Sequence, residues 1–95
     1  MSDAQMLAAL KTDLGYSVTA YDDRLANYLT SAQQSIKAEG YTALDPSALQ
    51  DDAELVIAFA RWKWDSRNDP KAAMPRMLRY WLNCRVMGEK AGAAT

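Results

Sequence analysis

Residues 51–65, DDAELVIAFARWKWD, include the most apolar segment of this chain and decide its fold. At about 100° of rotation per residue, apolar side chains fill two helical faces and leave a narrow polar stripe at Glu54, Arg61 and Asp65. The two apolar faces are Ala53, Val56, Ile57, Ala60 and Trp64, and Leu55, Phe59 and Trp62. A helix that is apolar on most sides is buried on most sides, so we expect other helices to cover both flanks. A buried strand over residues 55–60 is the rival interpretation, but the length of the periodic pattern and the neighbouring alanines favour a helix.

The flanking segments predict an all-α fold, a small bundle of three main helices plus a short N-terminal helix. The short helix covers residues 3–14, with Ser2 as its cap and Gly15 at its end. We expect the second helix to open at Thr19, whose hydroxyl would cap it, and to end at Gly40.

The third helix has two possible starts. Asp45-Pro46 reads as a cap followed by proline in the first turn, whereas a short turn over residues 46–50 would delay the start to about Asp51. The last helix has Pro75 in its first turn and Gly88 near its end. Residues 1–90 are therefore predicted to form one domain, followed by a flexible tail over residues 91–95.

Composition excludes several kinds of site. The 95 residues include no histidine and one cysteine, Cys84, which we interpret as a buried packing residue because its usual catalytic base is missing. No ligand cluster for a metal and no phosphate-binding glycine loop occurs. We therefore predict that the protein is not an enzyme and has no cofactor or metal. We expect no membrane association, because no signal-peptide pattern and no long apolar span is visible.

Charge is unevenly distributed along the chain. Residues 1–50 carry three basic and six acidic side chains, and residues 51–95 carry eight basic and six acidic side chains. An acidic first half and a basic second half suit head-to-tail contacts between copies, although two solvated faces would give the same pattern.

Residues 72–90, AAMPRMLRYWLNCRVMGEK, carry more apolar surface than a small domain can bury. One predicted face consists of Met74, Met77, Leu78, Trp81 and Leu82, and a basic stripe opposite consists of Arg76, Arg79, Asn83 and Lys90. Arg85 falls on the apolar face and needs a carboxylate, for which Asp65, Asp69 or a neighbouring copy are candidates. We expect Trp64 and Trp81 in the core. The candidate subunit interface consists of Trp62, Tyr80, Arg85, Val86 and Met87.

Four segments in this order resemble the head–tail connector proteins of tailed bacteriophages, the small helical adaptor or head-completion proteins found under the portal. They are residues 10–15, residues 21–25 (YDDRL), residues 52–56 (DAELV) and residues 74–83 (MPRMLRYWLN), and the resemblance covers about residues 7–88. The resemblance implies a virion protein of the head–tail interface, made in the cytoplasm of a bacterial host.

The same resemblance implies a homo-oligomeric ring that binds the portal, extends the DNA channel and provides a platform for a stopper or tail-completion protein. The basic stripe would then face an acidic partner or make passive contact with packaged DNA. The alternative is a small helical DNA-binding regulator that uses the basic last helix, although residues 66–72 are long for the turn of a helix-turn-helix motif.

Overall fold

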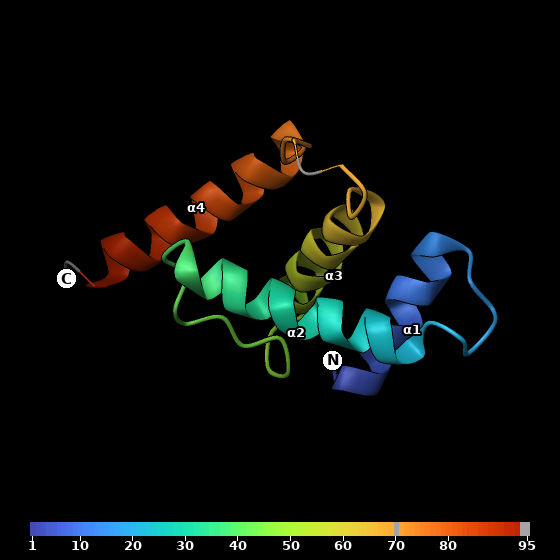
Figure 1. Cartoon of the computed structure of the whole chain (residues 1–95). Coiled ribbons are helices and arrows are strands. Elements are labelled where there is room, and N and C mark those ends of the chain that lie inside the picture. Colours follow the sequence, from blue (N-terminus) through green and yellow to red (C-terminus); the bar gives the residue numbers. More distant parts are fainter. Residues whose placement is uncertain (70, 94–95) are drawn as a thin grey trace.

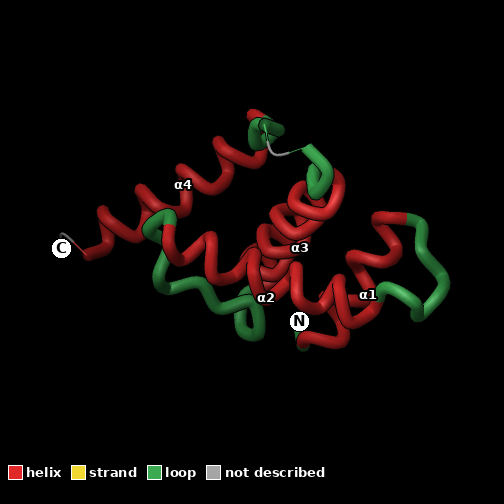
Figure 2. The backbone as a smooth tube through the Cα atoms, viewed as in Figure 1, coloured by secondary structure: helices red, strands yellow, loops and turns green. Residues whose placement is uncertain are grey.

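The computed structural model describes residues 1–69 and 71–93, and this part of the chain folds into four helices with no strand. They are α1 (Asp3–Leu14), α2 (Asp22–Ala38), α3 (Gln50–Asp65) and α4 (Arg76–Ala93), joined by three loops (Figures 1 and 2). The predicted all-α bundle of three main helices and a short leading helix is confirmed. The rival strand over residues 55–60 is wrong, because this segment lies inside α3.

The central element is α3, and its buried side chains point to more than one neighbour. They are Asp52, Ala53, Leu55, Val56, Ile57, Phe59, Ala60 and Trp64. Met6 and Leu10 of α1 and four residues of α2 (Leu25, Leu29, Ala32 and Ile36) belong to the same core. Figure 1 shows α1, α2 and α3 gathered together while α4 extends away from them.

The starts of α1 and α2 differ in how they are capped. The Ser2 hydroxyl accepts from the Gln5 amide in a capping box, and Gly15 ends α1 in the left-handed region at φ 75°, as predicted. Thr19 does not cap α2 with its hydroxyl. Instead, α2 begins after Tyr21 with no side-chain cap, and the Thr19 carbonyl accepts from the Asp22 amide at 3.1 Å in the preceding turn.

The connector between α2 and α3 resolves the two possible starts of the third helix in favour of the later one. The Asp45 carbonyl accepts from the amides of Ala48 and Leu49 at 3.2 and 3.0 Å, which closes a short turn, and α3 begins at Gln50. The Asp45 carboxylate accepts from the Ser47 hydroxyl at 2.6 Å, and this hydrogen bond lowers the pKa of Asp45.

Asp52 fixes this connector from the first turn of α3. Its side chain is fully buried, and its two carboxylate oxygens accept from the Tyr41 hydroxyl at 2.8 and 3.0 Å. One of them also accepts from the Asp45 amide at 3.0 Å. A carboxylate in the first turn is further stabilised by the positive end of the helix dipole. Asp52 therefore ties both ends of the segment 41–45 to α3.

The last helix, α4, is less covered than the others. Leu78 and Leu82 are buried, and Val86 packs at the α2 corner, where an added Cβ on Gly40 would lie 3.1 Å from Val86 Cγ1. The molecule measures 47 × 32 × 18 Å, and its radius of gyration of 13.6 Å exceeds the roughly 12 Å expected for a compact domain of this length. The backbone of α4 continues past Gly88 to Ala93, so residues 91–93 of the expected tail are helical and residues 94–95 lie outside the described residues.

Asp52→Ala is expected to lower the free energy of unfolding by about 2–4 kcal/mol, because it leaves the Tyr41 hydroxyl and the Asp45 amide without their charged acceptor. Tyr41→Phe removes only the hydroxyl donor to Asp52, so it should lower the free energy of unfolding by about half as much. Urea unfolding followed by circular dichroism measures both. Asp51→Ala is the matched control on the exposed neighbour. Equal effects of Asp51→Ala and Asp52→Ala would contradict the role of Asp52.

Gly40→Ala is expected to destabilise the fold by about 1–3 kcal/mol, because the φ of 121° and the close Val86 side chain both oppose a methyl group. Gly88→Ala should instead stabilise α4 by about 0.5–1 kcal/mol, since its Cβ would meet nothing within 4 Å. Thermal unfolding of the two variants measures the difference. A neutral Gly40→Ala variant would show that α4 is not held at this corner.

Candidate functional site

An apolar groove lies between α3 and α4. It has a volume of about 790 Å³ and is open to solvent along one side. Its lining consists of Ala58, Arg61, Trp62 and Asp65 from α3, Pro75 from the preceding loop, and Met77, Leu78, Tyr80, Trp81 and Cys84 from α4. Arg61 and Asp65 pair with each other at 3.7 Å, so the charges in the lining neutralise one another. The groove therefore offers an apolar surface rather than a charged one.

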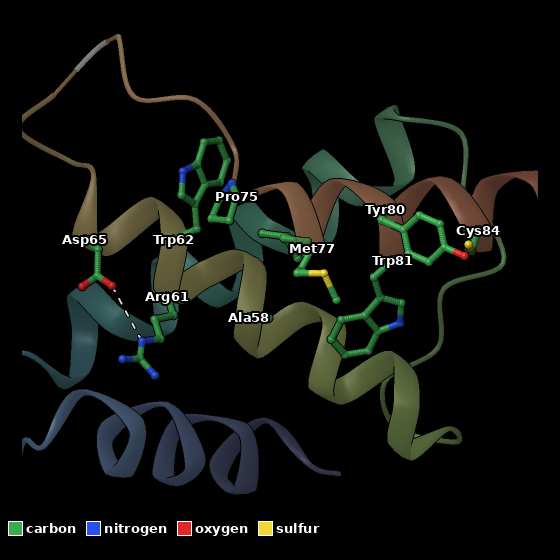
Figure 3. Close-up of a pocket in the computed structure, with 10 residues that line it drawn as sticks. Ala58, Arg61, Trp62, Asp65, Pro75, Met77, Tyr80, Trp81 and Cys84 are labelled. Carbon is green, nitrogen blue, oxygen red and sulfur yellow. Dashed lines mark ion pairs between the residues drawn. The ribbon is translucent and has the colours of Figure 1, made fainter.

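The α4 side of the groove is formed by side chains that α3 leaves uncovered. Met77 is 77% exposed and Tyr80 is 67% exposed, whereas Leu78, between them in sequence but on another side of the helix, is buried. Figure 3 shows Met77 and Trp81 extending from α4 toward α3, while the side chains of Tyr80 and Cys84 lie beside α4. Single exposed apolar residues are ordinary, but several that share one groove mark an interaction surface.

Two of these placements correct the sequence-based expectations. Met77 is predicted on the same apolar face as the buried Leu78 and Leu82, and Cys84 is predicted to be a buried packing residue, but both side chains are exposed. On the helical wheel they lie about 100° and about 120° from Leu78. Contact with one neighbouring helix buries an arc of the helix surface that is too narrow to include side chains this far from Leu78. The width of the apolar arc is the signal in the sequence that marks this side of α4 as uncovered.

The five candidate interface residues do not lie in one place. Trp62 and Tyr80 line the groove, Val86 is half-buried at the Gly40 corner, and Met87 is 69% exposed further along α4. Trp62 is also half-buried, because its indole N–H donates to the Ala73 carbonyl at 3.2 Å and its ring meets Phe59 edge-on. The structure therefore assembles Trp62 and Tyr80 with Met77, Trp81 and Cys84, and separates them from Val86.

Arg85 finds its carboxylate at neither of the expected residues. Its guanidinium lies 2.9 Å from Asp51, while Asp65 pairs with Arg61 and Asp69 accepts from the Lys71 amide. This Arg85–Asp51 pair joins α4 to the first turn of α3. It is partly exposed, so its contribution to stability is about 1 kcal/mol or less.

The predicted basic stripe is partly neutralised within the chain. Arg79 pairs with Glu39 at 3.2 Å, whereas Arg76 and Asn83 are exposed and Arg76 has no ion pair within the described residues. The side chain of Lys90 lies outside the described residues. Pairing of Arg79 reduces the positive charge available for phosphate groups. The core placement of Trp64 is confirmed at 2% exposure, while Trp81 is half-buried in the groove wall.

No cluster of metal-ligating side chains occurs in the described part of the chain. Among those residues, no helix has the length and hydropathy to cross a membrane. Burial between α2 and α3 lowers the pKa of Lys63, because it disfavours the charged form of the side chain. Its ammonium donates to the hydroxyls of Ser31 and Ser35 at 2.9 and 2.8 Å. These groups join two helices and lie outside the groove lining.

Comparison of the chain with models of protein families, with curated proteins and with solved structures found no match.

We expect Cys84 to react with a thiol reagent such as DTNB in the native protein at a rate close to that of the unfolded chain, because its side chain is exposed in the groove. The measurement is the rate of absorbance change without and with denaturant. Reaction only after unfolding would show that Cys84 is a buried packing residue and that the groove is closed in solution.

Proposed function

We propose that this protein is a non-catalytic structural adaptor that binds protein subunits through the groove between α3 and α4. The single observation that carries the proposal is the row of exposed apolar side chains on α4, Met77, Tyr80 and Met87, beside an open apolar groove. Apolar surface of this kind is stabilised when a partner covers it.

The biological setting that we propose is the head–tail interface of a tailed bacteriophage. There, copies would form a homo-oligomeric ring beneath the portal, extend the DNA channel and provide the docking platform for a stopper or tail-completion protein. This setting rests on the resemblance of four sequence segments to head–tail connector proteins.

The four segments have different parts in the structure. The first two are joined by an ion pair of 2.9 Å between Lys11 and Asp22, and the third contains Asp52, so these segments contribute to folding. The fourth segment, residues 74–83, contributes Met77, Tyr80 and Trp81 to the groove. The part of the resemblance that bears most directly on partner binding is therefore the fourth segment.

The alternative, a DNA-binding regulator, has less support from the geometry. The arginine that it would place on phosphates, Arg79, is paired with Glu39. The loop from Ser66 to Pro75 separates α3 from α4, which is longer than the turn of a helix-turn-helix motif.

The adaptor proposal predicts that the protein binds the portal protein encoded in the same genome and that the double variant Met77→Asp, Tyr80→Asp binds at least tenfold more weakly. Each variant side chain places a charge where an apolar contact is expected. A loss of about 1.4 kcal/mol of binding free energy corresponds to a tenfold lower affinity. Size-exclusion chromatography with light scattering and negative-stain imaging of the mixture measure complex formation. Gln34→Asp, an exposed position on α2, is the matched control.

Two results would contradict the adaptor. One is a protein that stays monomeric and never joins portal rings at any concentration tested. The other is a double variant that binds as well as the Gln34→Asp control. Micromolar binding to duplex DNA at moderate salt, measured by fluorescence anisotropy and abolished by Arg76→Glu, would favour the regulator instead.

A further inference from the structure

The loop between α1 and α2 projects from the molecule on the opposite side from α4 (Figure 1). Residues 17–20 of this loop are all exposed, and Val18 at 54% is one of the few large apolar side chains exposed outside α4. The segment from Tyr16 to Tyr21 contains no charged residue. It can enter an apolar groove without the cost of removing a charge from water.

Aromatic contacts and a hydrogen bond connect the base of this loop to α3. The rings of Tyr16 and Tyr21 lie 5.4 Å apart, and Tyr21 lies 5.7 Å from Trp64. The Trp64 indole N–H donates to the Tyr16 hydroxyl at 3.2 Å. A loop restrained at both ends has less conformational freedom to lose on binding, which favours association.

The groove is poorly suited to pairing with a copy of itself. Residues 71–88 carry four basic side chains and no acidic one. Two of the four, Arg79 and Arg85, pair with Glu39 and Asp51. A two-fold contact between two α4 helices would still bring the unpaired Arg76 of each copy together, because two-fold contacts always place the same patch on both sides. The occupant of the groove is therefore expected to come from a different, more acidic surface.

The end of the molecule that carries the α1–α2 loop is more acidic than the groove. Residues 11–24, which include the loop and the adjoining helix ends, carry three acidic and two basic side chains, and the charge of Lys11 is engaged by Asp22. Asp13 and Asp23 flank the loop, are exposed and have no ion pair within the described residues. At the groove, exposed Arg76 lies in sequence between two lining residues, Pro75 and Met77.

We propose that the groove between α3 and α4 receives the α1–α2 loop of a second copy of this chain, with Val18 against Met77 and Trp81, and Asp13 and Asp23 toward Arg76. The contact joins two different surfaces, so each copy offers a loop to one neighbour and a groove to the other. Repetition of such a contact gives a ring where the rotation closes. This inference rests on the proposed self-assembly and specifies the two surfaces that meet.

One such contact is small. A loop of this length covers less than the roughly 800 Å² per partner of a standard stable interface. Association of two copies is therefore expected to be weak, and ring closure or a portal template strengthens it through the neighbouring contacts. Covalent trapping is better suited than chromatography to detect a weak pairwise contact.

The only cysteine of the chain, Cys84, lines the groove and supplies a natural cross-linking partner. The double variant Val18→Cys, Cys84→Ser carries its only thiol on the loop, and the wild type carries its only thiol in the groove. The two proteins are mixed and oxidised with copper phenanthroline. We expect a mixed disulfide between position 18 and position 84 as the main product, identified by mass spectrometry of the linked peptides, and only minor homodimers.

The matched control is Ala48→Cys, Cys84→Ser, which carries its thiol at another exposed loop position. It should give at least tenfold less mixed disulfide with wild type. An independent test uses the protein with Cys84 intact and no oxidant, and measures the fraction of higher oligomers by light scattering. Val18→Asp should lower this fraction at least tenfold, while Val18→Leu keeps it. Both variants change an exposed side chain, and circular dichroism verifies that they fold.

Three results would overturn the inference. They are a dominant disulfide between two Cys84 residues, a mixed disulfide no more abundant than that of the Ala48→Cys control, and oligomers that Val18→Asp leaves unchanged. If light scattering still shows assembly or portal binding, the adaptor function stands and only the choice of surfaces is wrong. If the protein neither self-associates nor joins portal rings, the adaptor function fails as well.

Discussion

Burial of α3 on nearly all of its sides is the constraint on which the rest of this structure depends. A helix has no way to bury several faces on its own, and one neighbour covers only a limited arc. α1 and α2 therefore cover part of α3 and share its core, while α4 covers another part with Leu78 and Leu82. The apolar segment LVIAFA, residues 55–60, thereby determines where every other helix lies.

The end of α3 secures this arrangement through three consecutive residues, Trp62-Lys63-Trp64. Successive side chains on a helix point about 100° apart, so each of the three reaches a different neighbour. Trp62 donates to Ala73 in the loop before α4, Lys63 donates to two serines of α2, and Trp64 donates to Tyr16 in the loop after α1. These contacts give a structural role to a tripeptide that is unusual in composition, and they place the groove and the projecting α1–α2 loop at fixed positions relative to α3.

Much of the fold could be predicted from the sequence because apolar spacing and capping are local properties. The Ser2 cap of α1 and the buried faces of α3 follow directly from residue type and period. The partner of Arg85 could not be predicted, because Asp51 is 34 residues away in sequence and their contact depends on how α4 crosses α3. The partner of Asp52 could not be predicted either. Its hydrogen bond to Tyr41 depends on a loop conformation that no periodicity encodes.

The candidate site was predicted less completely than the fold. Tyr80 and Trp62 were identified because tyrosine and tryptophan are favoured at protein interfaces. Met77 and Cys84 were assigned to the buried side, since a helical wheel gives the direction of a side chain but not the width of the arc that a neighbour covers. The apolar arc of α4 is wider than the arc that α3 covers, and the uncovered part of it forms one wall of the open groove.

The limited cover of α4 also bears on local unfolding. Stability varies along a chain, and segments with few buried contacts open at a lower free energy than the core. In this protein α4 buries only Leu78 and Leu82 among its described residues and forms two partly exposed ion pairs, whereas α1, α2 and α3 supply most of the buried core. Backbone amides of α4 should therefore exchange with solvent deuterium before those of α3. A subunit seated in the groove would slow that exchange, so that recognition and the ordering of the last helix become one coupled equilibrium.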